Sequence, residues 1–216
     1  MTIIGFIGTG HIGTQVARTV TAAGYDVILS NAHDPDSLAP LVAELGVRAR
    51  ASTVHEAAAS ADLVVVAIPI SAFDSVPVAP LAGKTVIVTS NYNRDREGAL
   101  PALDSGETTV PGLLQAHLPG AHVVRAFSHI SSTEVTTAGR PAGTPHRRAL
   151  AIAGDDHEAK HAVAAIYDAI GFDTLDLGGL DEAWRVDRGQ PAFITHQDLA
   201  QLKANVDRAD RSRSGR

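Results

Sequence analysis

The chain has 216 residues, of which 44% are hydrophobic, enough for one sizeable core or for a nucleotide-binding domain with a small appendage. Its 24 acidic and 18 basic residues give a net charge of -6, which argues against nucleic acid or an anionic membrane as a partner. The lack of cysteine excludes disulfides, a thiolate nucleophile and a cysteine metal site. The longest apolar run, from Leu63 to Ile70, is too short to cross a bilayer, and a strand beginning at Ile3 leaves no room for a signal peptide. We therefore expect a soluble cytoplasmic protein.

A glycine-rich turn near the N-terminus organises the predicted fold. The apolar segment from Ile3 to Ile7 is typical of a buried strand, the pattern Gly-x-Gly-x-x-Gly follows, and apolar residues then recur at helical spacing. In such a unit Gly8 allows the tight turn, Gly10 lets the backbone approach a pyrophosphate, and Gly13 lets the helix pack on the strand. The start of the helix favours negative charge. The pattern predicts dinucleotide binding, and the alternative is a glycine-rich turn without a ligand.

The residues after the second strand, predicted over 25–29, bear on the choice between NADP and NAD. An NAD-binding protein usually has a carboxylate there, which repels a 2′-phosphate. This chain has Ser30 and Asn31, which can donate hydrogen bonds to phosphate, and His33, which can add positive charge. Two aspartates just downstream and the lack of an arginine count against this. We expect NADP, with NAD and a solvated turn at His33 as alternatives.

Further strands and helices alternate along the chain. Strands are predicted over 47–51, 63–68, 85–89, 122–127, 149–153 and 172–177, with helices at 38–45, 53–59, 113–118 and 157–170 and another beginning at Thr195. This alternation predicts an α/β protein with a Rossmann-type, doubly wound and mostly parallel sheet. We assign residues 1–125 to a dinucleotide-binding domain and residues 126–216 to a small C-terminal α/β extension that completes the sheet and the cleft.

Ligands of such sheets bind outside the carboxyl ends of the strands. Ala67, Ile68 and Pro69 should therefore line the cofactor cleft, with a plain strand end and turn as the alternative. Asn91 is a candidate polar group beside the nicotinamide, unless it only forms a turn.

Phe127, Ser128 and His129 should reach the same cleft from the other side. His129 is then a candidate proton donor, against the alternative of an ordinary loop histidine.

Two loops carry positive charge. Residues 92–111 form a long polar loop of a length typical of lids and partner surfaces. Residues 139–148, with Arg140, His146, Arg147 and Arg148, are the most basic stretch and could attract an anionic second ligand; a solvated charge cluster is the commoner explanation.

The sequence His157-Glu158-Ala159-Lys160-His161 matches a zinc-protease pattern. Helical geometry argues against a metal there, because both histidines fall away from the apolar face and toward solvent. We predict no metal site.

Several segments together resemble a known family. These are Gly8-Thr9-Gly10-His11-Ile12-Gly13, Leu29-Ser30-Asn31, Ala67-Ile68-Pro69, Asn91-Tyr92, Val124-Arg125-Ala126-Phe127 and Ala153-Gly154-Asp155-Asp156. In this order they are similar to the NADP oxidoreductases that depend on the deazaflavin coenzyme F420, a group with a pyrroline-5-carboxylate reductase-type NADP-binding domain. The chain differs at Ala32-His33, where the family usually has arginine, and at Ser128, where it commonly has asparagine.

The resemblance implies reversible hydride exchange between NADP and the deazaflavin in a homodimer. It also implies that Thr9, His11 and Ile12 hold the pyrophosphate and that Ser30 and Asn31 hold the 2′-phosphate.

Three functions stay open at this stage. The first is hydride transfer between NADPH and the deazaflavin, with the basic loop through Arg147 meeting the coenzyme's anionic tail. The second is NADPH-dependent reduction of a small carbonyl, imine or metal chelate, for which His129 or Asn91 would be needed. The third is a sensor that binds NADP without turnover. Direct hydride transfer needs no covalent nucleophile, so no catalytic residue is assigned beyond these two candidates.

Overall fold

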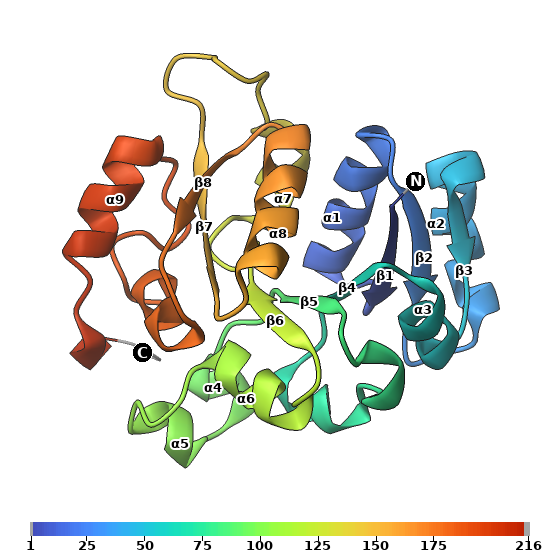
Figure 1. The fold of residues 1–216 in the computed structure, drawn as a ribbon, viewed down its shortest axis with the longest axis horizontal. Helices are drawn as coiled ribbons and strands as arrows, with labels where there is room; N and C mark the ends of the chain where they lie inside the picture. Colours follow the sequence, from blue (N-terminus) through green and yellow to red (C-terminus); the bar gives the residue numbers. More distant parts are fainter. Residues whose placement is uncertain (1, 214–216) are drawn as a thin grey trace.

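The computed structural model describes residues 2–213. Within them eight strands form one sheet in the order β3-β2-β1-β4-β5-β6-β7-β8 (Figure 1). The strands are β1 (Ile3–Ile7), β2 (Asp26–Ser30), β3 (Ala49–Ala51), β4 (Leu63–Val66), β5 (Thr85–Val88), β6 (His122–Arg125), β7 (Ala149–Gly154) and β8 (Asp173–Asp176). The first six are paired in parallel in the order of a dinucleotide-binding fold. The predicted Rossmann-type fold is therefore confirmed.

The sheet changes direction after β6. β7 pairs with β6 antiparallel, with Arg125 opposite Ala153, and β8 then pairs with β7 in parallel. The C-terminal part of the chain thus extends the same sheet, at the side occupied by the orange and red segments in Figure 1.

Helices cover both faces of the sheet. Their bounds are α1 (His11–Ala22), α2 (Ala39–Leu45), α3 (Val54–Ser60), α4 (Arg94–Glu97), α5 (Pro101–Asp104), α6 (Val110–His117), α7 (Ser132–Thr137), α8 (His157–Ala169) and α9 (Leu199–Asp207). Side chains of β1 alternate between the faces: Phe6 packs in the cluster that holds α1, α7 and α8, whereas Ile7 packs with α3 and α6. A smaller cluster joins β7 to α9. Both faces of the sheet are therefore buried, as continuous apolar strands require.

Two predicted segments differ in detail. The loop 92–111 contains the short helices α4 and α5, each of which begins after a residue with extended backbone, Asn93 or Leu100. The helix predicted to begin at Thr195 begins at Leu199, after the capping residue Asp198. The Asp198 carboxylate accepts from the Gln201 backbone N–H at 3.0 Å, and the Gln201 side chain accepts from the Asp198 N–H at 3.1 Å. This reciprocal pair fixes the start of α9 at Leu199.

Candidate cofactor cleft

The three glycines of the N-terminal turn have different surroundings. Gly8 has a φ of +101°, and a Cβ there would lie 2.4 Å from the Ala67 carbonyl oxygen. A Cβ on Gly13 would lie 2.3 Å from the Gly8 carbonyl oxygen. A Cβ on Gly10 would meet no atom of the protein within 4 Å. Gly8 and Gly13 are therefore required by the packing of the turn itself, whereas the space beside Gly10 is open to a ligand.

A cleft of about 490 Å³ opens beside this turn, at the carboxyl ends of the central strands. Eight predicted cofactor residues line it, namely Gly10, His11, Ile12, Ala67, Ile68, Pro69, Asn91 and Phe127. The predicted residues Gly8, Thr9, Gly13, Ser30, Asn31 and His33 are not part of its lining. Gly8 and Gly13 are packed against the backbone of the turn and of its neighbouring strand end. Thr9 lies in the turn, and Ser30, Asn31 and His33 lie at or just after the end of β2.

The end of β2 offers fewer phosphate donors than the sequence suggested. Ser30 is fully buried, and its hydroxyl donates to the Phe6 carbonyl oxygen at 2.6 Å. Its single hydrogen is therefore engaged within the sheet. Asn31 accepts from the His33 backbone N–H at 2.8 Å and donates through Nδ2 to the Ser37 hydroxyl at 3.2 Å. Asn31, His33 and Ser37 form the polar group at this strand end, and Ser37 is a residue that the sequence pattern did not identify.

A buried arginine orients Asn91 in the cleft. Arg125 is 1% exposed and donates through Nη2 to Asn91 Oδ1 at 2.7 Å and through Nε to the Ser128 hydroxyl at 2.9 Å. Asn91 Nδ2 in turn donates to the Ser128 carbonyl oxygen at 2.6 Å. Both ends of the Asn91 carboxamide are thus held in one orientation.

The charge of Arg125 is balanced by Asp187, whose Oδ1 lies 2.5 Å from Arg125 Nη2. Burial raises the pKa of Asp187, and the neighbouring guanidinium opposes that shift. Asp187 follows the turn of helix over Leu180–Val186. The ion pair therefore ties the C-terminal part of the chain to β6 directly behind the cleft.

His129 does not reach the cleft, and the expectation that it does is wrong. Phe127 and Ser128 line the cleft, but His129 turns into the core, where it is 1% exposed. Its Nε2 accepts from the Ala151 backbone N–H at 2.8 Å. Burial lowers its pKa to about 3, and the nearby charges of Arg125 and Arg148 act in the same direction. A neutral, inward-facing ring of this kind is not placed to donate a proton to a ligand in the cleft.

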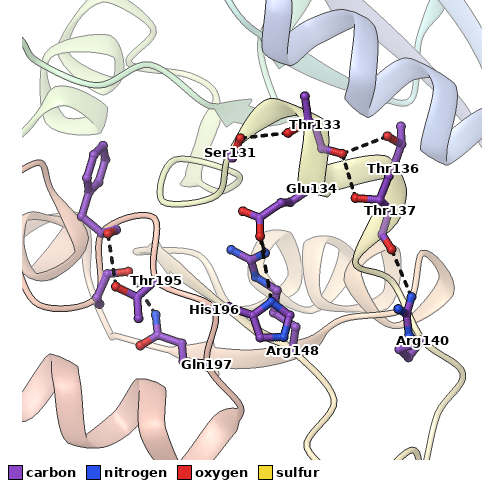
Figure 2. A network of polar contacts seen from close by, with 12 residues as sticks. Ser131, Thr133, Glu134, Thr136, Thr137, Arg140, Arg148, Thr195, His196 and Gln197 are labelled. Carbon is purple, nitrogen blue, oxygen red and sulfur yellow. Dashed lines mark hydrogen bonds and ion pairs between the residues drawn. The ribbon is translucent and has the colours of Figure 1, made fainter.

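The last two arginines of the basic loop, Arg147 and Arg148, are buried, whereas Arg140 and His146 are exposed. This corrects the expectation that Arg147 meets an anionic ligand. Arg147 is 5% exposed and its Nη1 lies 2.7 Å from Asp168 and 3.0 Å from Asp173. Arg148 is 2% exposed, with Nη1 2.8 Å from Glu134. Figure 2 shows Arg148 beside Glu134 of α7, with the His196 ring next to them. The guanidinium groups of Arg147 and Arg148 are therefore paired with carboxylates of the protein itself.

Further residues from both halves of the chain complete the cleft. The lining includes Arg96, Ile130, Ser132, Arg188, Phe193 and Ile194, together with Thr89, Ser90, Tyr92, Asn93 and Ser128. A second cavity of about 590 Å³ shares Tyr92 and Asn93 with the cleft and extends to Trp184 and Asp187. Of these residues, Tyr92, Asn93 and Arg96 lie in the loop whose length pointed to function, and Ser128 was expected at the cleft; Phe193 and Ile194 carry no sequence motif.

The zinc-like pattern is on the surface. His157 and His161 are exposed on α8, while Ala159 and Val163 are buried against the sheet. Among the described residues there is no group of three or more histidine, aspartate or glutamate side chains placed to hold a metal. The described part of the chain also contains no helix with the length and apolar character needed to cross a membrane.

Residues 3–92 match the family model described as NADP oxidoreductase, coenzyme F420-dependent. The rat metalloreductase STEAP3 is 28% identical over 186 residues, which are 85% of this chain; the chain spans only 35% of the length of that relative.

Two solved structures share the fold. Protein SMa0349 of Sinorhizobium meliloti superposes with a TM-score of 0.78 at 26% identity, over 92% of this chain and 96% of the other. A protein of Arthrobacter sp. FB24, provisionally described as an F420-dependent NADP reductase, superposes with a TM-score of 0.71 at 24% identity, over 85% and 87%. The predicted resemblance to the coenzyme F420-dependent NADP oxidoreductases is therefore confirmed, and the match to their family model spans residues 3–92.

Proposed function

We propose that this protein is an NADP(H)-dependent oxidoreductase that transfers hydride between NADPH and a second, planar ring, with the deazaflavin coenzyme as the first candidate acceptor. In this proposal residues 1–125 bind the dinucleotide, and residues 126–216 form the extension that completes the cleft. The observation that carries the proposal is the position of the cleft, which begins at the open side of Gly10 and ends at the oriented carboxamide of Asn91.

The residues around the turn fit a dinucleotide. The open side of Gly10 and the first amides of α1 would receive the pyrophosphate, with Thr9, His11 and Ile12 beside it. Asn31 and His33, joined by Ser37, would receive the 2′-phosphate of NADP. The bound nicotinamide would supply the hydride, and the protein's part is to hold the two rings in contact and exclude water.

The part of the cleft around Asn91 and Ser128 suits hydride transfer without a proton donor. Asn91 and Ser128, the polar side chains held by Arg125, do not ionise. The Tyr92 hydroxyl is engaged by Gly98 and Asp104 at 3.0 and 2.9 Å, and burial raises its pKa. Positioning is thus the contribution that these side chains can make.

Absorbance spectroscopy tests the proposal directly. Purified protein is mixed with NADPH or NADH, each with and without the oxidised deazaflavin coenzyme. We expect rapid reduction of the deazaflavin with NADPH and much slower reduction with NADH. Binding of NADPH without reduction of this acceptor would contradict the deazaflavin assignment, and absence of NADPH binding would contradict the cofactor assignment as well. Light scattering on the same sample tests the homodimer that we propose.

A second candidate acceptor is a metal chelate, which the similarity to the rat metalloreductase favours. The same assay with ferric citrate distinguishes the two candidates. NADPH oxidation with ferric citrate but not with the deazaflavin would support the metal chelate, and the reverse result would exclude it.

A further inference from the structure

Ile194 has a backbone conformation that isoleucine rarely adopts. Its φ is 50°, in the left-handed region that is unfavourable for a β-branched side chain. It lines the cleft, and 48% of its surface is exposed. A large apolar side chain is therefore held, at an energetic cost, in a position open to a ligand.

The contacts of the surrounding segment maintain this conformation. The Ile194 backbone N–H donates to the His129 carbonyl oxygen at 3.1 Å. The Thr195 hydroxyl donates to the Pro191 carbonyl oxygen at 3.1 Å, and Gln197 Nε2 donates to the Ala192 carbonyl oxygen at 3.0 Å. Residues 191–197 thus form a turn with internal hydrogen bonds, and the bond from Ile194 to His129 ties this turn to the buried segment after β6.

The other non-glycine residues with positive φ in the described chain show how such strain is usually offset. Phe127, with a φ of 56°, is 1% exposed, so its side chain gains from full burial. His146, with a φ of 54°, has Nδ1 2.7 Å from the Asp198 carboxylate. The Ile194 side chain is not fully buried and has no polar group, so neither of these contributions offsets its strained backbone. The hydrogen bonds of its own segment hold the Ile194 backbone, and its apolar side chain stays open to contact with a bound molecule.

We propose that Ile194, together with its neighbour Phe193, is the specificity-determining lip of the cleft and packs against the flat face of the acceptor ring. This proposal rests on the proposed function. Ile68 and Pro69 line the cleft from the segment after β4, and Phe127 and Ile130 line it from the segment after β6. Apolar walls of this kind select a planar acceptor over a compact polar one, because they offer contact area and few charged groups.

The test compares Ile194→Ala with Ile194→Gly by binding. Oxidised deazaflavin coenzyme is titrated into protein saturated with NADP+, so that no turnover occurs, and binding is followed by fluorescence. Both variants should weaken deazaflavin binding by about five- to tenfold, as expected for loss of one half-exposed aliphatic contact, with NADP+ affinity unchanged. In urea unfolding the glycine variant should be more stable than the alanine variant, because only glycine adopts the left-handed backbone without strain.

The pair His146→Ala and His146→Gly is a matched control. It should repeat the stability order without changing deazaflavin binding, because His146 is not part of the cleft lining. Unchanged deazaflavin affinity in both Ile194 variants would overturn the proposed lip, as would failure of the wild-type protein to bind the deazaflavin. Binding that depends on Ile194 but gives no turnover with NADPH would instead contradict the proposed function and leave the lip in place.

Discussion

The two walls of the cleft are built by different means. On the side of the glycine turn and β4, the wall consists of backbone and short apolar side chains close in sequence to their strands, and it leaves open space at Gly10. On the side of Phe127 and Ile194, the wall depends on a buried ion pair and on backbone in the left-handed region. The first wall suits a constant part of a cofactor. The second depends on contacts between distant segments, and we propose that it holds the partner of that cofactor.

The largest expected effect comes from removing the ion pair of Arg125 and Asp187, on which the second wall depends. Arg125→Met removes a fully buried charge and leaves the Asp187 carboxylate without its partner, so we expect a loss of about 3–5 kcal/mol of unfolding free energy, measured in urea. Adding Asp187→Asn to this variant should recover part of the loss, because no unpaired charge is then buried. A loss below about 1 kcal/mol in the single variant would show that the second wall does not depend on this pair.

His129 should make the second wall sensitive to acid. Its pKa is about 3 in the folded protein and 6.5 for an ordinary histidine, so the unfolded chain binds a proton that the folded chain does not. The stability contributed by neutral His129 is complete above pH 6.5 and falls as the pH drops toward 3.

The corresponding loss at pH 5 is about 2 kcal/mol. His129→Gln keeps a side-chain acceptor for the Ala151 N–H without a titrating group, so its unfolding free energy should fall less between pH 7 and pH 5. Equal pH dependence of the two proteins would contradict the buried, neutral assignment.

The glycines test the first wall. Gly10→Ala should weaken NADPH binding by about tenfold or more while the urea midpoint stays the same, since the new methyl group meets no protein atom but occupies the space that we propose for the pyrophosphate. Gly13→Ala should lower the midpoint, because its methyl group overlaps the Gly8 carbonyl. Loss of stability in Gly10→Ala would mean that the open side is part of the packing.

The smallest expected effect concerns the charges at the rim. Arg188→Gln should raise the KM for the deazaflavin about two- to fivefold, and the difference should shrink at high salt, because an exposed arginine acts on an anionic tail through a screened charge. Arg140→Gln is the control, since Arg140 belongs to the basic loop and donates to the Thr137 and Gly139 carbonyl oxygens. A larger effect at Arg140 than at Arg188 would restore the basic loop as the anion site.

The sequence by itself determined the fold and the first wall. Strand positions follow from runs such as Leu63 to Val66, and the roles of Gly8, Gly10 and Gly13 follow from their spacing within one strand-turn-helix unit. A side chain at Gly13 is excluded by the nearby Gly8 carbonyl, whereas one at Gly8 is excluded by the Ala67 carbonyl at the end of the neighbouring strand. The same reasoning placed Ala67 to Pro69 and Asn91 at the cleft, since parallel strands end at a common edge.

Which residues form the second wall, on the side of Phe127 and Ile194, was decided only by the tertiary structure. The inward turn of His129, the engagement of the Ser30 hydroxyl by Phe6, and the pairing of Arg147 with Asp168 and Asp173 depend on contacts between distant segments. Residue type cannot distinguish a buried, paired arginine or histidine from one that faces a ligand. Ile194 reaches the cleft because its backbone is anchored to His129, 65 residues earlier in the chain, and such a contact has no local signature.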